Sequence, residues 1–189
     1  GNSSVIADRV GIGCGDYLLT EAGFGADMGA ERFFNIKCRI GGMRPDAAVL
    51  VATVRALKTH AGRYNVIPGK PLPPAMLEDN LDDVLAGAAN LRKHIEIVRE
   101  FGVSPVVALN VFPTDHPGEI DAVRKVAEAA GAHFASSTHV VDGGDGAIDL
   151  AHAVVAACDH KADFRYTYDL EDSLVEKLTK VATKVYGAD

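Results

Sequence analysis

Short apolar runs alternate along the chain with longer stretches in which apolar residues recur every three or four positions. The apolar runs predict strands at residues 16–20, 46–53, 105–110, 132–136 and 164–168. The longer stretches have the spacing of helices that pack on a sheet. This alternation predicts an α/β fold: a mostly parallel sheet with helices on both faces.

Several elements can be predicted more closely. The runs at 47–52 and 106–109 are apolar throughout, so we expect central strands there. The longest helix is predicted over residues 77–101, with a break or bend at Gly87, because glycine costs about 1 kcal/mol relative to alanine inside a helix. Residues 62–74 carry four of the eight prolines and predict an ordered excursion without regular structure.

Helix starts are marked by capping residues. Asn2 or Ser3 can cap the first helix and Asp27 the second. Pro117 and Glu119 fit the opening turn of a helix that ends at Gly131.

Composition narrows the class of protein. The 189 residues are 48% hydrophobic and 24% charged, which is typical of one soluble domain with a buried core. A net charge of −7 gives no electrostatic footprint for nucleic acid or an anionic membrane. Three cysteines without a C-x-x-C, and histidines without metal-ligand spacing, predict neither disulfides nor a metal site. We therefore expect a cytoplasmic protein, and a first residue other than Met suggests a segment of a longer chain.

Ligands of open parallel sheets bind at the carboxyl ends of the strands, so the loops there are candidate sites. In the loop at 21–27, Gly23 and Gly25 allow the backbone to approach a ligand, and the following helix offers free N–H groups to an anion. Glu21 stands where it could orient Mg²⁺ or water. The same pattern is also typical of a glycine-rich turn capped by Asp27.

The loop at 110–115 combines polar and aromatic residues. Asn110 and Asp115 resemble the residues with which P-loop proteins clamp a base, and Phe112 beside Pro113 forms a stiff platform for a flat heterocycle. The alternative is that Asn110 and Asp115 form local turns while Phe112 covers the core.

Two further loops carry weaker signals. Gly143, Gly144 and Gly146 precede a helix predicted at 147–158, where they could cradle an anion or simply form the helix entry. Arg55 and Lys58 follow the strand at 46–53 within one turn, and such a pair often only solvates a helix face.

Several stretches together carry a family resemblance. The longest is TEAGFGADMGAERFFNIKCR at 20–39; the others are GNSSVIAD at 1–8, VLVATVRALK at 49–58, ANLRKHIE at 89–96, NVFPTD at 110–115, DGGDG at 142–146 and VYGAD at 185–189. Over nearly its whole length, the chain resembles the formate–tetrahydrofolate ligase family.

The resemblance implies an ATP-dependent ligation, in which formate and ATP give formyl phosphate and N10 of tetrahydrofolate then attacks the formyl carbon. It implies a P-loop NTPase-like core with ATP and Mg²⁺, assisted by a monovalent cation. The expected partners are formate, tetrahydrofolate, the rest of the ligase chain and further copies in a homo-oligomer. Because a Gly-Lys-Ser/Thr phosphate loop is missing from these residues, the resemblance implies a single central α/β segment, 1–189, inactive alone.

The resemblance also implies roles for individual residues. Phe112, with Pro113, matches the aromatic that stacks on the pterin, and Val140 stands where relatives carry the tryptophan that covers its other face. Glu21 and Asp27 are the catalytic candidates, in a loop whose Gly23, Phe24 and Gly25 face the phosphates. The nucleotide-binding candidates are Asn110, Asp115, Ser136, Ser137, Thr138, Gly143 and Gly144. The alternative is a noncatalytic nucleotide- or partner-binding module on the same scaffold.

Overall fold

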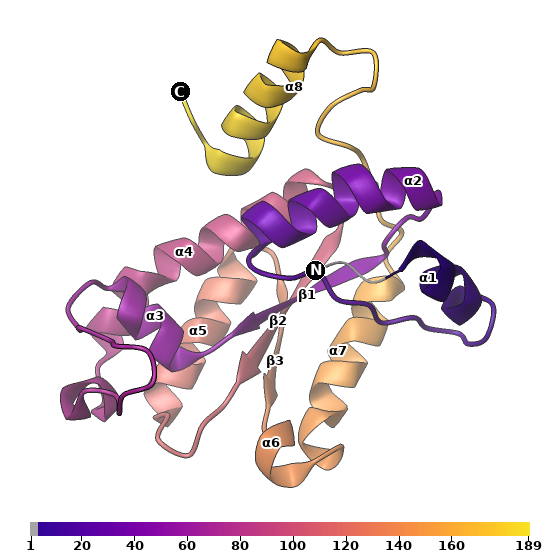
Figure 1. The fold of residues 1–189 in the computed structure, drawn as a ribbon. Helices are drawn as coiled ribbons and strands as arrows, with labels where there is room; N and C mark the ends of the chain where they lie inside the picture. Colours follow the sequence, from indigo (N-terminus) through magenta and orange to yellow (C-terminus); the bar gives the residue numbers. More distant parts are fainter. Residues whose placement is uncertain (1–3) are drawn as a thin grey trace. The chain divides into compact units, whose positions relative to one another are not determined.

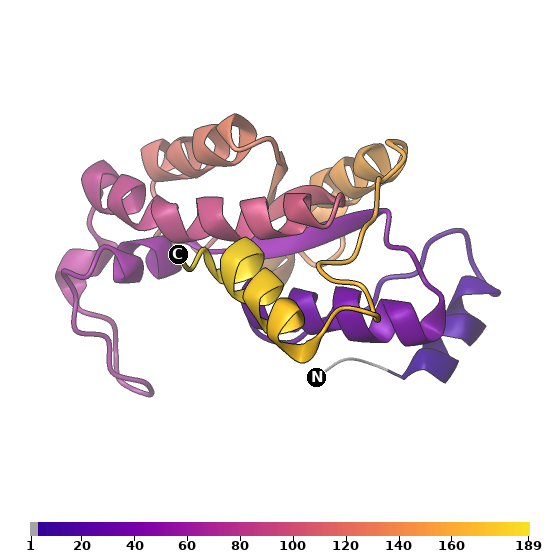
Figure 2. The same ribbon diagram turned by 90° about the horizontal axis from the view of Figure 1, so that it is seen from above.

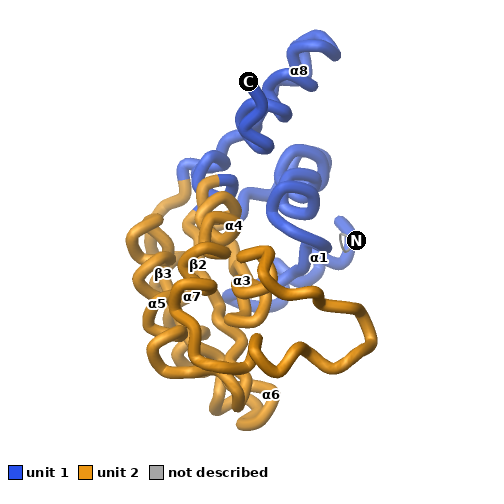
Figure 3. The backbone as a smooth tube through the Cα atoms, turned by 90° about the vertical axis from the view of Figure 1, so that its left-hand side faces the viewer, with its two compact units in different colours: residues 1–45, 97–103, 163–189 blue, residues 46–96, 104–162 orange. Residues whose placement is uncertain are grey.

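The computed structural model describes residues 4–189, which form two compact units (Figure 3). Unit 1 comprises residues 4–45, 97–103 and 163–189, and unit 2 comprises 46–96 and 104–162. Each unit combines segments that are distant in the sequence. The boundary between the units therefore cannot be recognised as a single change of composition along the chain. The single segment expected over 1–189 stays a prediction. Asn2 and Ser3, expected to cap the first helix, lie outside the described residues.

The sheet lies in unit 2 and is parallel (Figure 1). Its strands, in the order β1-β2-β3, are β1 (Ala47–Ala52), β2 (Ser104–Asn110) and β3 (His133–Ser137). Ala52 pairs with Leu109, and Asn110 pairs with Ser137, so the carboxyl ends of the strands meet at one edge. Three of the five predicted strands and the predicted α/β class are thereby confirmed.

Helices cover both faces of this sheet, as predicted (Figure 1). They are α3 (Val54–His60), α4 (Leu81–Glu100), α5 (Pro117–Ala129) and α7 (Ile148–Cys158). Val107 and Leu109 of β2 belong to a core with residues of α3, α4 and α5. The alternate residues Val106 and Ala108 are also buried, and α7 packs against all three strands.

The expectation that both apolar runs are central is wrong for β1. Among the strands described, β2 is central and β1 lies at the edge of the sheet. Val51 is 74% exposed, although it is part of a fully apolar run. A fully apolar run indicates that both faces of a strand are apolar. It does not indicate whether the strand has a neighbouring strand on one side or on both.

The predicted break at Gly87 is also wrong. Residues Pro74–Leu77 form a short 3₁₀ helix, η3, and α4 then runs from Leu81 to Glu100 without interruption. A Cβ at Gly87 would lie 1.8 Å from the carbonyl oxygen of Leu57 in α3. Glycine at this position therefore permits the close approach of α4 to the α3 backbone.

The excursion after α3 forms no helix or strand from residue 63 to residue 73 and extends as a long loop (Figure 2). Its start is fixed to α4 through the buried Asp83. The Tyr64 hydroxyl donates to Asp83 Oδ2 at 2.5 Å, and Arg63 forms a 2.8 Å ion pair with the same carboxylate.

Unit 1 contains helical and irregular segments. Its helices are α1 (Val5–Ile12), the stretch η1 (Ala26–Ala30), η2 (Phe33–Cys38) and α2 (Arg39–Gly41), then α8 (Leu174–Val181) and η5 (Ala182–Tyr186). Ser4 caps α1 by accepting from the N–H groups of Ile6 and Ala7. No helix within residues 4–189 is both long and apolar enough to cross a membrane.

The strands predicted at 16–20 and 164–168 are wrong, since both segments are irregular. Residues 16–20 are exposed. The second segment is held by side chains instead of by a neighbouring strand. Asn35 donates to Thr167 Oγ1 at 3.1 Å and accepts from the Thr167 N–H at 2.9 Å, while Arg39 donates to the Tyr168 carbonyl at 2.6 Å.

Candidate functional site

The carboxyl edge of the sheet in unit 2 brings three of the predicted loops together. Thr53 follows β1 and caps α3, since its Oγ1 accepts from the Ala56 N–H at 3.1 Å. The next residue after β2, Val111, donates to the carbonyl of Ser137, the last residue of β3, at 3.0 Å. The loops that follow β2 and β3 are therefore directly connected.

The loop at 111–116 is closed by Asp115. Its Oδ2 accepts from the Phe112 N–H at 2.9 Å, and the Asp115 N–H donates to the Phe112 carbonyl at 2.9 Å. Burial raises the pKa of the Asp115 carboxyl, and the Phe112 N–H and the charge of Arg55 partly offset this. The two hydrogen bonds with Phe112 show that Asp115 forms a local turn, and its predicted role in nucleotide binding stays a prediction.

The raised pKa of Asp115 predicts how an amide would behave there. Because the folded-state pKa lies above that of the unfolded chain, ionisation of Asp115 costs stability as pH rises through that interval. Asp115→Asn keeps an acceptor for the Phe112 N–H without the charge. We expect a higher thermal midpoint than wild type at about pH 7, and no difference below about pH 4. A lower midpoint for the variant at neutral pH would contradict this account.

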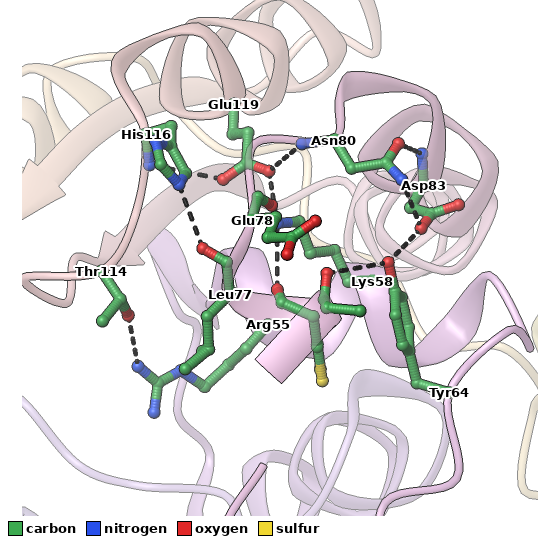
Figure 4. Close-up of polar contacts among 12 residues, drawn as sticks. Arg55, Lys58, Tyr64, Leu77, Glu78, Asn80, Asp83, Thr114, His116 and Glu119 are labelled. Carbon is green, nitrogen blue, oxygen red and sulfur yellow. Dashed lines mark hydrogen bonds and ion pairs between the residues drawn. The ribbon is translucent and has the colours of Figure 1, made fainter. Parts of the chain in front are cut away.

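Arg55, in the first turn of α3, stacks on Phe112. Its guanidinium carbon lies 3.5 Å from the centre of the Phe112 ring, and Nη2 donates to Thr114 Oγ1 at 3.3 Å (Figure 4). The interpretation of Arg55 as a residue that only solvates a helix face is wrong. Its position just after the carboxyl end of β1 is the signal that could have placed it at this edge.

Phe112 also borders a small cleft of about 160 Å³. The lining residues come from the loops after β2 and β3: Val111, Phe112, Pro113, Thr138, Val141 and Asp142. The candidate Val140 lies beside this cleft in the sequence but is not among its lining residues, and its side chain is 69% exposed. Successive residues of α6 (His139–Asp142) point in directions about 100° apart, so adjacent valines face different surroundings.

The loop after β3 is held by its own polar groups. Thr138 Oγ1 donates to Asp142 Oδ2 at 2.6 Å, and Ser137 Oγ lies 2.9 Å from His139 Nδ1. Gly143 has a left-handed backbone with φ of +60°. A Cβ at Gly146, in η4 (Asp145–Ala147), would lie 2.6 Å from Thr138 Oγ1. The turn itself therefore requires glycine at positions 143 and 146. Gly143 and Gly144 are exposed, and Ser136 is partly buried.

The loop at 21–27 belongs to unit 1 and is strained. Phe24 is exposed and has a φ of +66°, which is uncommon for a residue with a side chain. The Arg32 guanidinium lies 6.0 Å from its ring centre. The helical stretch begins after Gly25, so Asp27 lies in its first turn and the prediction that Asp27 caps it is wrong. Glu21 is exposed.

Gly29 provides a test of this loop. A Cβ at Gly29 would lie 1.7 Å from the Gly23 carbonyl oxygen, so Gly29→Ala must displace the backbone of the loop. If this loop faces the phosphates, as the family resemblance implies, the variant of the full-length protein should lose at least about tenfold in kcat for ADP release, since small misplacements at such a site cost up to about a hundredfold. Gly118→Ala, where a Cβ meets open space, is the matched control. Equal kcat values in the two folded variants would exclude a role for the loop.

Lys58, in α3, forms a buried ion pair with Glu119 of α5. Lys58 is 2% exposed and is paired with Glu119 (Figure 4). Its Nζ also donates to the carbonyls of Met76 at 3.1 Å and Glu78 at 2.6 Å, and Glu119 accepts from the Asn80 N–H at 2.9 Å. Lys58 thus joins α3, α5 and residues 76–80, and the expectation of a solvated residue is wrong.

Candidate metal ligands are not gathered in the described part of the chain. Among residues 4–189, no group of three or more His, Cys, Asp or Glu side chains is placed to hold a metal ion.

Comparison with known proteins decides the family. The family model for formate–tetrahydrofolate ligases matches residues 1–189. The chain belongs to the formate–tetrahydrofolate ligase family. All 189 residues align with curated ligases from Cutibacterium acnes, Saccharopolyspora erythraea and Chloroflexus aurantiacus, at 97%, 64% and 50% identity. The chain spans about a third of the length of these relatives, with 34%, 34% and 33% covered.

Within this ligase segment, the candidates after β2 and β3 share one edge of unit 2. The roles predicted for Phe112, Asn110 and Thr138 are untested and stay predictions. The loop with Glu21 and Gly25 lies in the other unit, and its role also stays a prediction. Sequence reasoning did not indicate the Arg55–Phe112 stack, because it depends on side-chain conformations.

Proposed function

We propose that the protein containing this segment joins formate to tetrahydrofolate at the expense of ATP. A formate oxygen attacks the γ-phosphorus and ADP leaves; N10 of tetrahydrofolate then attacks the formyl carbon of formyl phosphate and phosphate leaves, giving 10-formyltetrahydrofolate. The observation that supports this most directly is the family match over residues 1–189. One-carbon metabolism, a cytoplasmic setting, a homo-oligomer and an assisting monovalent cation belong to the same proposal.

The segment's contribution in this proposal is to position substrates. Phe112 and Pro113 supply an apolar surface for the pterin, and the cleft between the loops after β2 and β3 supports this assignment. Val140 is assigned to the other face of the pterin. The nucleotide side is assigned to Asn110, Asp115, Ser136, Ser137, Thr138, Gly143 and Gly144. Phosphoryl transfer relies mostly on positioning and electrostatics, so residues of this kind can carry much of the catalysis.

The phosphate-facing role is assigned to the loop at 21–27, with Glu21 and Asp27 as its carboxylates and Gly23, Phe24 and Gly25 as its backbone. ATP bound with Mg²⁺ is part of the proposal. Within the described residues, no group of three or more His, Cys, Asp or Glu side chains is placed to hold the Mg²⁺ ion.

The deciding experiment is ADP release by the full-length protein. We expect release that requires both formate and tetrahydrofolate. We expect no detectable synthesis from the 189 residues alone, because they lack a Gly-Lys-Ser/Thr phosphate loop. Absence of formate-dependent release from the full-length protein would favour a noncatalytic module. Turnover by the 189 residues would show that the phosphate chemistry lies within them.

A further inference from the structure

Arg55 is held by few contacts besides the Phe112 ring. The guanidinium carbon lies 3.5 Å from the ring centre, and one hydrogen bond of 3.3 Å reaches Thr114 in the same loop. Arg55 Nε is buried and has no hydrogen-bond partner within residues 4–189. Within the same residues, Arg55 forms no ion pair with a carboxylate. The stack on Phe112 is therefore the main direct interaction of this side chain.

The position of Arg55 is fixed from the backbone. Thr53 caps α3 and so sets where the helix begins, which places Arg55 in its first turn. The loop opposite is fixed by the two hydrogen bonds between Phe112 and Asp115. The guanidinium and the ring are thus presented to each other by two independently anchored backbones, in unit 2 alone.

Phe112 lines the cleft, whereas Arg55 does not. A cation over an aromatic face is attracted by the ring quadrupole, and the planar guanidinium of arginine stacks on such a face as lysine cannot. Holding the ring still before a ligand arrives lowers the entropy lost on binding.

We propose that Arg55 is a positioning residue for pterin binding: it covers one face of Phe112 and holds the ring so that a flat ligand in the cleft can stack on it. This inference rests on the proposed function, because the flat ligand is the pterin of tetrahydrofolate. Arg55 acts through Phe112 and not by touching the ligand.

The test uses Arg55→Met and Arg55→Lys in the full-length protein. Met keeps an unbranched apolar stem without the charge, and Lys keeps the charge without the planar fork. We expect Arg55→Met to raise the KM for tetrahydrofolate about three- to thirtyfold, as a cation–π contact of this kind predicts. The kcat and the KM for ATP should stay unchanged, and Arg55→Lys should fall between Met and wild type.

Arg124→Met is the matched control. The Arg124 guanidinium carbon lies 5.1 Å from the centre of the Phe134 ring, so the same kind of contact is removed from an exposed part of unit 2. Its KM values should equal those of wild type.

Calorimetric titration with tetrahydrofolate separates this inference from the proposed function. If wild type binds tetrahydrofolate without releasing ADP, the proposed function fails, and the ratio of Kd between Arg55→Met and wild type still decides the role of Arg55. A ratio near one overturns the inference, as does a wild type that binds no tetrahydrofolate. An equal rise of the KM for ATP and for tetrahydrofolate also overturns it, because it indicates a general structural role.

Discussion

Replacing Lys58 with Met in the full-length protein should lower its stability by about 3–5 kcal/mol, because this substitution leaves a buried carboxylate without its cation. Glu119 is fully buried, and Lys58 is its ion-pair partner. Lys58 also binds two backbone carbonyls, so residues 76–80 lose an anchor at the same time. The shift in the urea midpoint of the transition that includes this unit measures the loss.

Lys125→Met is the control for this experiment. Lys125 forms an ion pair of 2.8 Å with Asp121 on the surface of α5, with 75% of the Lys125 side chain exposed. Water screens such a pair, so its removal should leave the midpoint nearly unchanged. Limited proteolysis should show faster cleavage near residues 76–80 in Lys58→Met alone. Equal midpoints for the two variants would mean that the buried pair contributes no more than the exposed one.

The Lys58–Glu119 ion pair is a part of the site that could not be predicted from the sequence. A lysine one turn after a strand is usually solvated, and nothing near Lys58 in the sequence indicates that its side chain is buried. Its partner Glu119 was predicted only as a residue of a helix's opening turn, which it is, since Glu119 accepts from the His116 N–H at 3.3 Å. The pairing of these two residues requires the fold that brings α3 beside α5.

The strand predictions show the same limit of what can be inferred from the sequence. The run that became β2 is buried on both faces, and burial in a covered parallel sheet accounts for its apolar pattern. The run of β1 is as apolar although Val51 is 74% exposed, and β3 includes His133 and Ser136. The run at 164–168 carries aromatic residues at alternate positions, and they have a different role. Phe164 packs on Phe34, with ring centres 5.8 Å apart, and Phe34 packs on Phe101 at 4.8 Å. A run of five residues cannot distinguish a strand from an irregular segment held by aromatic side chains.

The position of the loops was predictable because the carboxyl ends of parallel strands meet at one edge. The contacts that each residue makes in these loops were not predictable. Asp115 closes its own turn, and Val141 lines the cleft where Val140 was expected. Asn110 Oδ1 is buried and has no hydrogen-bond partner within the described residues, which distinguishes it from Asp115 as a candidate for contact with a ligand.

Phe112→Ala in the full-length protein should weaken tetrahydrofolate binding by about ten- to a hundredfold, since stacking of a base on an aromatic side chain is worth about 1–3 kcal/mol in nucleic-acid complexes. Arg55 covers one face of this ring, so a ligand can stack only on the other face, and these 189 residues contain no tryptophan that could replace it. The KM for tetrahydrofolate should rise while the KM for ATP stays the same.

Val140→Trp tests the same site from the opposite side. Val140 is 69% exposed, so an indole can be added there without disturbing the core. If the pterin lies between the loops after β2 and β3, the new ring covers its second face and the KM for tetrahydrofolate should fall about tenfold. Val140→Leu adds bulk without an aromatic face and should leave the KM unchanged. If Val140→Trp and Phe112→Ala are both without effect in folded protein, the pterin does not stack between these two loops.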